Sequence, residues 1–185
     1  VFLKAKSLMG RIPKGMAVVP AGRFFAGHNE GLTEFWSDAY FVGIYEVTVA
    51  DWTACVSGGT CAPPAANSFT YLKDDCTWFS GGKSSAMNCV AAADAKAYCQ
   101  AVVPDGRLPT VAEWQKAARG GCEKYAGLDC AKATPPYPWG QDSPNAAVWV
   151  PTTCSEPGCP KPVGTKPGGK SPYGLYDMSG NVAEF

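Results

Sequence analysis

The first elements that the hydrophobic pattern predicts are strands near the N-terminus. Short apolar and aromatic runs cover residues 16–19, 23–26 and 39–42, and the first two are separated by Pro-Ala-Gly at 20–22. Bulky apolar runs of this length, bounded by Pro and Gly, are typical of strands. We expect the first two runs to form a hairpin and the third to add one further strand.

Helical spacing follows in two stretches. In the first, Thr48 can cap a helix whose apolar residues repeat on one face until the glycines at 58–59. In the second, an alanine-rich face carries charge on its opposite side, and Pro104 ends the helix. The residues expected to face the core are Val49, Trp52 and Val56 in the first helix and Val90, Ala93, Ala97 and Ala101 in the second.

A third helix has the clearest start signal. Thr110 can accept a hydrogen bond from the amide of Glu113, whose carboxylate can reach back to the Thr110 amide, which is a capping box. Trp114 and Ala117 then fall on the face expected to be buried, and the glycines at 120–121 end the helix.

The remaining sequence predicts loops around a single core. Residues 61–88 have no sustained period, and the stretch after residue 121 is rich in Gly and Pro. The chain of 185 residues is long enough for one domain and short for two. We expect an α+β fold that is loop-rich, with short strands and two main helices.

Charge and hydropathy exclude two kinds of partner. Lys plus Arg and Asp plus Glu each number 16, so the net charge is zero, which argues against a surface for nucleic acid or anionic membranes. The longest uncharged run, residues 52–72, is interrupted by Gly and Pro. We therefore expect no nucleic-acid partner and no membrane span.

Nine cysteines dominate the candidate chemistry, either as metal ligands, as reactive thiols or as disulfides. They contain no C-x-x-C pair, and the only histidine, His28, lies in a turn where we expect a structural role, so zinc ligands are scarce. Disulfides are the favoured interpretation and indicate an extracytoplasmic or secreted protein. Proximity suggests the pairs Cys55–Cys61, Cys76–Cys89, Cys122–Cys130 and Cys154–Cys159.

We expect no signal peptide within the opening stretch of this sequence. Lysine and arginine residues at 4, 6, 11 and 14 interrupt it, so it lacks an apolar segment of the required length. We expect either that an export signal has been removed or that the chain is an internal piece of a longer protein.

Several blocks, read in order, resemble the formylglycine-generating enzyme (sulfatase-modifying factor) family. These blocks are residues 17–24, 45–48, 97–99, 107–110 with 113–114, 118–121, 137–140 and 174–182. The resemblance implies a C-type-lectin-like fold over residues 16–185, incomplete at the C-terminus, with residues 1–15 as an N-terminal extension or linker.

The resemblance also implies chemistry. The family's enzymes are oxidases that convert a cysteine of an exported sulfatase to formylglycine, using oxygen and copper held by two cysteines. No cysteine of this chain maps onto that pair, and Cys99 matches a structural cysteine of some members. A related branch uses non-haem iron bound by histidines, of which this chain has one. We expect a family protein without the catalytic cysteines that acts on an exported protein or peptide; the alternative is a non-catalytic, lectin-like binding or accessory module of a secreted bacterial protein.

A calcium site is the second implication. In the family, the positions matching Asp177, Gly180, Val182 and Glu184 bind Ca²⁺ through two side-chain oxygens and two main-chain carbonyls. Calcium prefers six to eight hard oxygen ligands, which a tight loop between two carboxylates can supply. The alternative interpretation of this motif is a surface turn with solvated carboxylates.

Reduction provides a test of the cysteine assignment. If eight cysteines form disulfides, each gains one hydrogen on reduction, so the intact mass should rise by about 8 Da. Mass spectrometry of the denatured protein before and after reduction measures this difference. An unchanged mass would contradict the disulfide interpretation.

Overall fold

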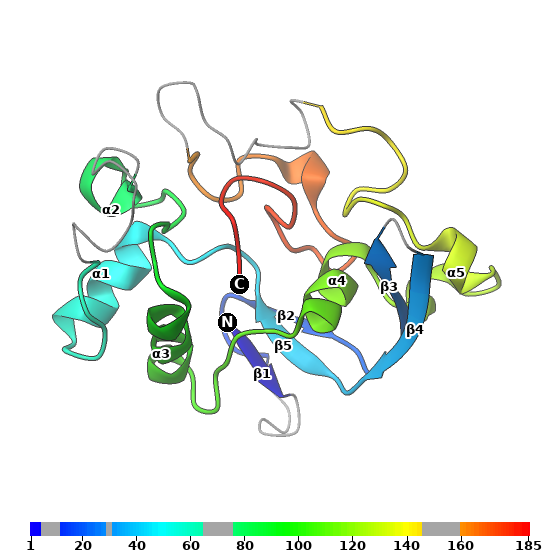
Figure 1. The fold of residues 1–185 in the computed structure, drawn as a ribbon, viewed down its shortest axis with the longest axis horizontal. Coiled ribbons are helices and arrows are strands. Elements are labelled where there is room, and N and C mark those ends of the chain that lie inside the picture. The colour runs from blue at the N-terminus through cyan, green and yellow to red at the C-terminus, as the bar shows by residue number, and fades with distance from the viewer. Residues whose placement is uncertain (5–11, 29–30, 65–75, 146–159) are drawn as a thin grey trace.

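The computed structural model describes residues 1–4, 12–28, 31–64, 76–145 and 160–185. Its central sheet has three antiparallel strands in the order β1 (Phe2–Lys4), β5 (Tyr40–Gly43) and β2 (Met16–Val19). Phe2 lies opposite Val42, so part of the segment expected to be an extension or linker is an edge strand of this sheet. Helices α1, α2 and α3 lie on one side of the central sheet and α5 lies on the other side, beside β3 and β4, while the two chain ends lie close together near the middle of the view (Figure 1).

A second sheet consists of β3 (Gly22–His28) and β4 (Gly31–Ser37), paired antiparallel. The predicted hairpin between residues 16–19 and 23–26 is therefore wrong. The chain leaves the central sheet at residues 20–22, and β2 pairs with β5, where Val19 and Tyr40 are both buried. Burial of these two large side chains favours this pairing over the local hairpin.

The three predicted helices are present as α1 (Val49–Ser57), α3 (Ala92–Val102) and α4 (Val111–Arg119). Single-turn helices α2 (Thr77–Ser80) and α5 (Cys130–Ala133) and the 3₁₀ turns η3 (Cys122–Tyr125) and η4 (Pro167–Gly169) lie in the regions expected to be loops. Thr48 caps α1 and forms a capping box with Asp51. The mixed α+β class is confirmed.

The expected buried face of α3 is wrong. Ala93, Ala97 and Ala101 are exposed, whereas Tyr98 and Cys99 face the core. The Tyr98 ring stacks on Trp52 of α1 with 5.2 Å between centroids. An aromatic ring buries far more apolar surface than an alanine methyl group, so Tyr98 sets the orientation of the helix.

Helix α4 packs over the central sheet and begins at the predicted capping box of Thr110 and Glu113. The Glu113 carboxylate also accepts two hydrogen bonds from the Arg107 guanidinium, at 2.6 and 2.8 Å. Ala117 and Ala118 are buried in the main core with residues of the sheet and of the C-terminal segment. That core contains Phe2, Val19, Tyr40, Val42, Leu175 and Met178.

A fully buried lysine fixes the turn between the two sheets. Lys116 of α4 donates from Nζ to the carbonyl oxygens of Pro20 (2.6 Å) and Gly22 (3.3 Å) and to the Ser37 hydroxyl (3.0 Å). Burial lowers the pKa of Lys116. Its hydrogen bonds satisfy backbone acceptors in the turn where the chain leaves β2.

Disulfides cross-link the loops as predicted. Cys55–Cys61, Cys76–Cys89 and Cys122–Cys130 are bonded, and Cys99 is a buried free thiol. The fourth predicted pair, Cys154–Cys159, lies outside the described residues. Within the described ranges, no helix is long and apolar enough to cross a membrane.

Glu113 gives the fold a testable pH dependence. Burial alone would raise the pKa of Glu113, but hydrogen bonds from Arg107 and Thr110 and the Arg107 charge hold it below its usual value. A lowered carboxyl pKa stabilises the fold at pH values above the unfolded-state pKa, and this stability is lost as the pH falls.

We expect Glu113→Gln to reduce the free energy of unfolding by about 1–2 kcal/mol at pH 7 and by much less at pH 3. Urea unfolding at both pH values measures the difference. Glu34→Gln is the matched control, because Glu34 pairs with Arg23 on the surface, where both side chains are at least half exposed. An equal loss at the two pH values would contradict the assignment.

Candidate functional site

The candidate site forms where the C-terminal segment crosses the end of β5. The Tyr176 amide donates to the carbonyl oxygen of Ile44 at 2.9 Å, and the Tyr176 ring stacks on Tyr45. Leu175 is fully buried just before this contact. These interactions hold the loop that begins at Asp177 against the central sheet.

Glu46, which follows β5 and precedes α1, binds the middle of this loop. Its Oε2 accepts a hydrogen bond from the Asn181 side-chain amide at 2.6 Å, and its Oε1 accepts one from the Val182 backbone amide at 3.3 Å. Asn181 is 1% exposed, and its amide group also exchanges hydrogen bonds with the backbone of Lys161. The middle of the loop, at Asn181 and Val182, is thus held in place by hydrogen bonds that involve the side chains of Glu46 and Asn181.

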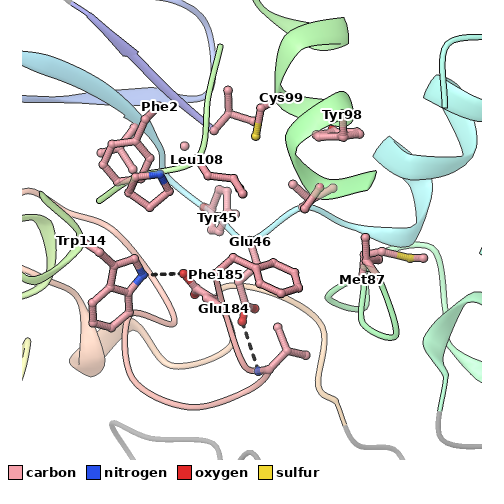
Figure 2. Close-up of a pocket in the computed structure, with 18 of the residues that line it drawn as sticks. Phe2, Tyr45, Glu46, Met87, Tyr98, Cys99, Leu108, Trp114, Glu184 and Phe185 are labelled. Carbon is pink, nitrogen blue, oxygen red and sulfur yellow. Dashed lines mark hydrogen bonds between the residues drawn. The ribbon is translucent and has the colours of Figure 1, made fainter. Parts of the chain in front are cut away.

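The two predicted carboxylates lie at opposite ends of the loop. Asp177 is buried, has a φ of 56°, and accepts a hydrogen bond from the Gly164 amide at 2.6 Å. Glu184 accepts a hydrogen bond from the Trp114 indole at 2.6 Å (Figure 2). Positive φ is uncommon for an aspartate and requires support from the surrounding structure, here the Gly164 contact.

Mutual repulsion adds to the cost of burying these carboxylates. Burial raises the pKa of Glu46 to about 8; the hydrogen bond from Asn181 opposes this, and the negative charges of Glu184 and Asp177 increase it. The pKa of Asp177 is raised chiefly by burial. Glu184 is exposed as a residue, yet its carboxylate is held against Trp114, and its pKa is raised by desolvation and by the charge of Asp177. A bound cation would relieve this repulsion.

The four residues predicted as calcium ligands line one cavity of about 400 Å³. Asp177, Gly180, Val182 and Glu184 share its wall with Trp114. Among the described residues, no three His, Cys, Asp or Glu side chains are arranged to hold a metal, so a cation here would also need main-chain oxygens. Two carboxylates and the carbonyls of Gly180 and Val182 would provide an all-oxygen set of the kind that calcium prefers.

Sequence reasoning missed Glu46 and the role of Trp114. Glu46 lies 135 residues before Asn181, and Trp114 lies 70 residues before Glu184. Trp114 was expected to be buried in the core, whereas it is half-buried and donates to the site. Residues so far apart in the sequence form no short motif, so neither contact could be predicted from local spacing.

An apolar pocket of about 160 Å³ adjoins the carboxylate cavity. The two share six lining residues, namely Pro109, Trp114, Met178, Val182, Glu184 and Phe185. Figure 2 shows aromatic rings around this pocket, with the Cys99 thiol and the Glu46 and Glu184 carboxylates in its wall. Other lining residues include Phe2, Trp52, Tyr98 and Leu108.

The thiol chemistry that the resemblance implies is not assembled among the described residues. Cys99 is the free cysteine there, and burial raises the pKa of its thiol, which favours the protonated form at neutral pH. The two thiolates needed for copper are therefore not supplied by the described part of the chain. His28 lies at the end of β3, opposite Gly31.

The fold and the site together define a loop-rich α+β domain with an anchored C-terminal acidic loop. The family model for the sulfatase-modifying factor enzyme 1-like domain matches residues 5–185. The chain belongs to this family, which confirms the resemblance drawn from the sequence blocks.

One known protein similar to this chain is an oxygenase. A hercynine oxygenase of Mycolicibacterium smegmatis is 37% identical over 92 residues, which are 50% of this chain and 19% of that protein. Thus the match spans about a fifth of this relative.

Two solved structures share the fold. PvdO of Pseudomonas aeruginosa superposes with a TM-score of 0.61 at 22% identity, covering 88% of this chain and 66% of PvdO. CarF gives a TM-score of 0.57 at 23% identity, covering 91% of this chain and 78% of CarF.

Proposed function

We propose that this domain is a calcium-binding module of the sulfatase-modifying factor type, which binds an apolar segment of an exported protein or peptide. The observation that carries the proposal is that all four predicted calcium ligands line one cavity, directly beside the apolar pocket. The disulfides support an extracytoplasmic location, because such bonds persist in oxidising compartments.

The residues of the loop would have distinct roles. Asp177 and Glu184 would supply the charge for Ca²⁺, and Gly180 and Val182 the carbonyl oxygens. When bound, Ca²⁺ neutralises the carboxylates and cross-links the two ends of the loop. Asp177 is oriented by Gly164 and Glu184 by Trp114, so both carboxylates are already held near the cavity.

The apolar pocket would bind the peptide. Its aromatic walls, formed by Trp52, Tyr98 and Trp114, suit an apolar side chain. Glu184 and Trp114 belong to both cavities, so ordering of Glu184 by calcium would also order one wall of the pocket. Calcium would in this way support peptide binding without contacting the peptide.

The second candidate function is oxygen-dependent oxidation of a protein thiol, as in the formylglycine-generating oxidases. It is favoured by the free Cys99 thiol in the pocket wall and by the similarity to an oxygenase. Copper would need two thiolate ligands, whereas the described residues supply one free cysteine, Cys99. They therefore do not fit a copper site. We therefore derive no catalytic step for these residues.

Calcium binding is tested by thermal unfolding. Calcium at about 100 times its Kd should stabilise the protein by roughly 2.7 kcal/mol and raise Tm by about 5–10 °C relative to protein in chelator. Asp177→Ala should abolish this rise, because it removes one of two carboxylate ligands. Asp38→Ala, on an exposed site away from the loop, is the control and should respond like the native protein. If chelator and calcium give the same Tm for the native protein, the calcium site is refuted.

A fluorescent cysteine-containing apolar peptide separates the two candidate functions. With calcium present, we expect saturable binding, measured by anisotropy, that weakens at least tenfold in Leu108→Arg, because a charge would enter the pocket wall. Incubation of the protein and the same peptide with copper and oxygen, followed by reduction of any disulfides and mass spectrometry, should yield no aldehyde. Conversion of the cysteine to an aldehyde would establish the oxidase instead.

A further inference from the structure

The Glu46 carboxylate holds the loop at the residue between the two proposed carbonyl ligands. Its two oxygens accept from the Asn181 side chain and from the Val182 backbone amide. Gly180 and Val182 flank Asn181 directly. A single side chain from the end of β5 therefore fixes the peptide unit between Asn181 and Val182, which lies between the two peptide units that carry the proposed carbonyl oxygens.

The backbone at Asn181 requires such a support. Its φ is 61°, and Gly180 before it has a φ of 97°, so two successive residues adopt left-handed conformations. Asparagine tolerates this region better than most residues but still prefers others. The buried hydrogen bonds of Asn181 to Glu46 and Lys161 compensate for that preference.

We propose that Glu46 is a positioning residue for calcium: through Asn181 and Val182 it orients the carbonyl groups of Gly180 and Val182 toward the cavity that also contains Asp177 and Glu184. This inference rests on the proposed calcium site. Partners that orient metal ligands without touching the metal typically contribute 10–100-fold to affinity.

Terbium is a suitable probe, because it takes hard oxygen ligands like those of calcium and luminesces when a nearby indole is excited. The Trp114 indole donates to Glu184, so terbium bound by Glu184 would lie close to a sensitising ring. Luminescence titration gives the affinity, and lifetimes in H₂O and D₂O give the number of bound water molecules. A purely structural role for Glu46 would not change that number.

The key variants are Glu46→Gln and Glu46→Asp. Glutamine keeps one acceptor oxygen but replaces the other with an NH₂ donor, so it can accept only one of the two hydrogen bonds. Aspartate keeps the charge but is too short to make both hydrogen bonds. We expect each to weaken terbium binding by about 10–100-fold and to add about one or two bound waters, since displaced carbonyls are replaced by solvent. Circular dichroism verifies folding, and the aspartate variant carries the test if the glutamine variant does not fold.

Thr77→Val is the matched control. Thr77 is buried and hydrogen-bonded to the Ala86 carbonyl and to Asn88, away from the loop, so its loss should lower Tm but leave terbium affinity and hydration unchanged. Native affinity and hydration in both Glu46 variants would overturn the positioning role while leaving the calcium site intact. Absence of terbium and calcium binding by the native protein would refute the calcium site itself, and the positioning role with it.

Discussion

Residues 170–185 contain no helix or strand, so several of their buried polar groups pair with distant parts of the chain. Unpaired buried backbone groups are costly, and a loop cannot pair them internally as a helix or sheet does. Here the partners are the Ile44 carbonyl, the Glu46 carboxylate and the Gly164 amide. These bonds fix the acidic loop and, with it, the wall that separates the two cavities.

Helix α4 also makes contacts with residues that are distant in the sequence, and these contacts reach the rest of the domain. Residues 113–116 all make long-range contacts. The Tyr40 hydroxyl donates to the Glu113 backbone carbonyl, while the side chains of Trp114, Gln115 and Lys116 contact Glu184, the Gly27 amide and the turn after β2, respectively. Because a helix turns by about 100° per residue, these side chains leave it in different directions. One nine-residue helix thereby connects both sheets and the acidic loop.

What the sequence could predict was local. The capping boxes at Thr48 and Thr110 and the three disulfides all join residues close in sequence, and each is present. The hairpin partner of β2, the buried face of α3 and the role of Glu46 depend on packing between distant segments, which periodicity does not encode. The sequence does not predict strand β4, because its side chains are largely exposed and do not alternate between buried and exposed positions. For the site, the motif from Asp177 to Glu184 identified the loop but not the groups that hold it.

The pairing of an apolar pocket with an acidic cavity has an electrostatic consequence. Charges beside apolar walls lose solvation, which is the main reason that the pKa values of Glu46, Asp177 and Glu184 are raised. Repulsion between such carboxylates is also stronger there than in water. The same low polarity strengthens attraction for a cation that fits the cavity. A ligand filling the pocket would exclude more water from Glu184, which lines both cavities, and would increase that attraction further. Thermodynamic linkage then requires the reverse effect, so calcium would strengthen binding in the pocket by the same factor.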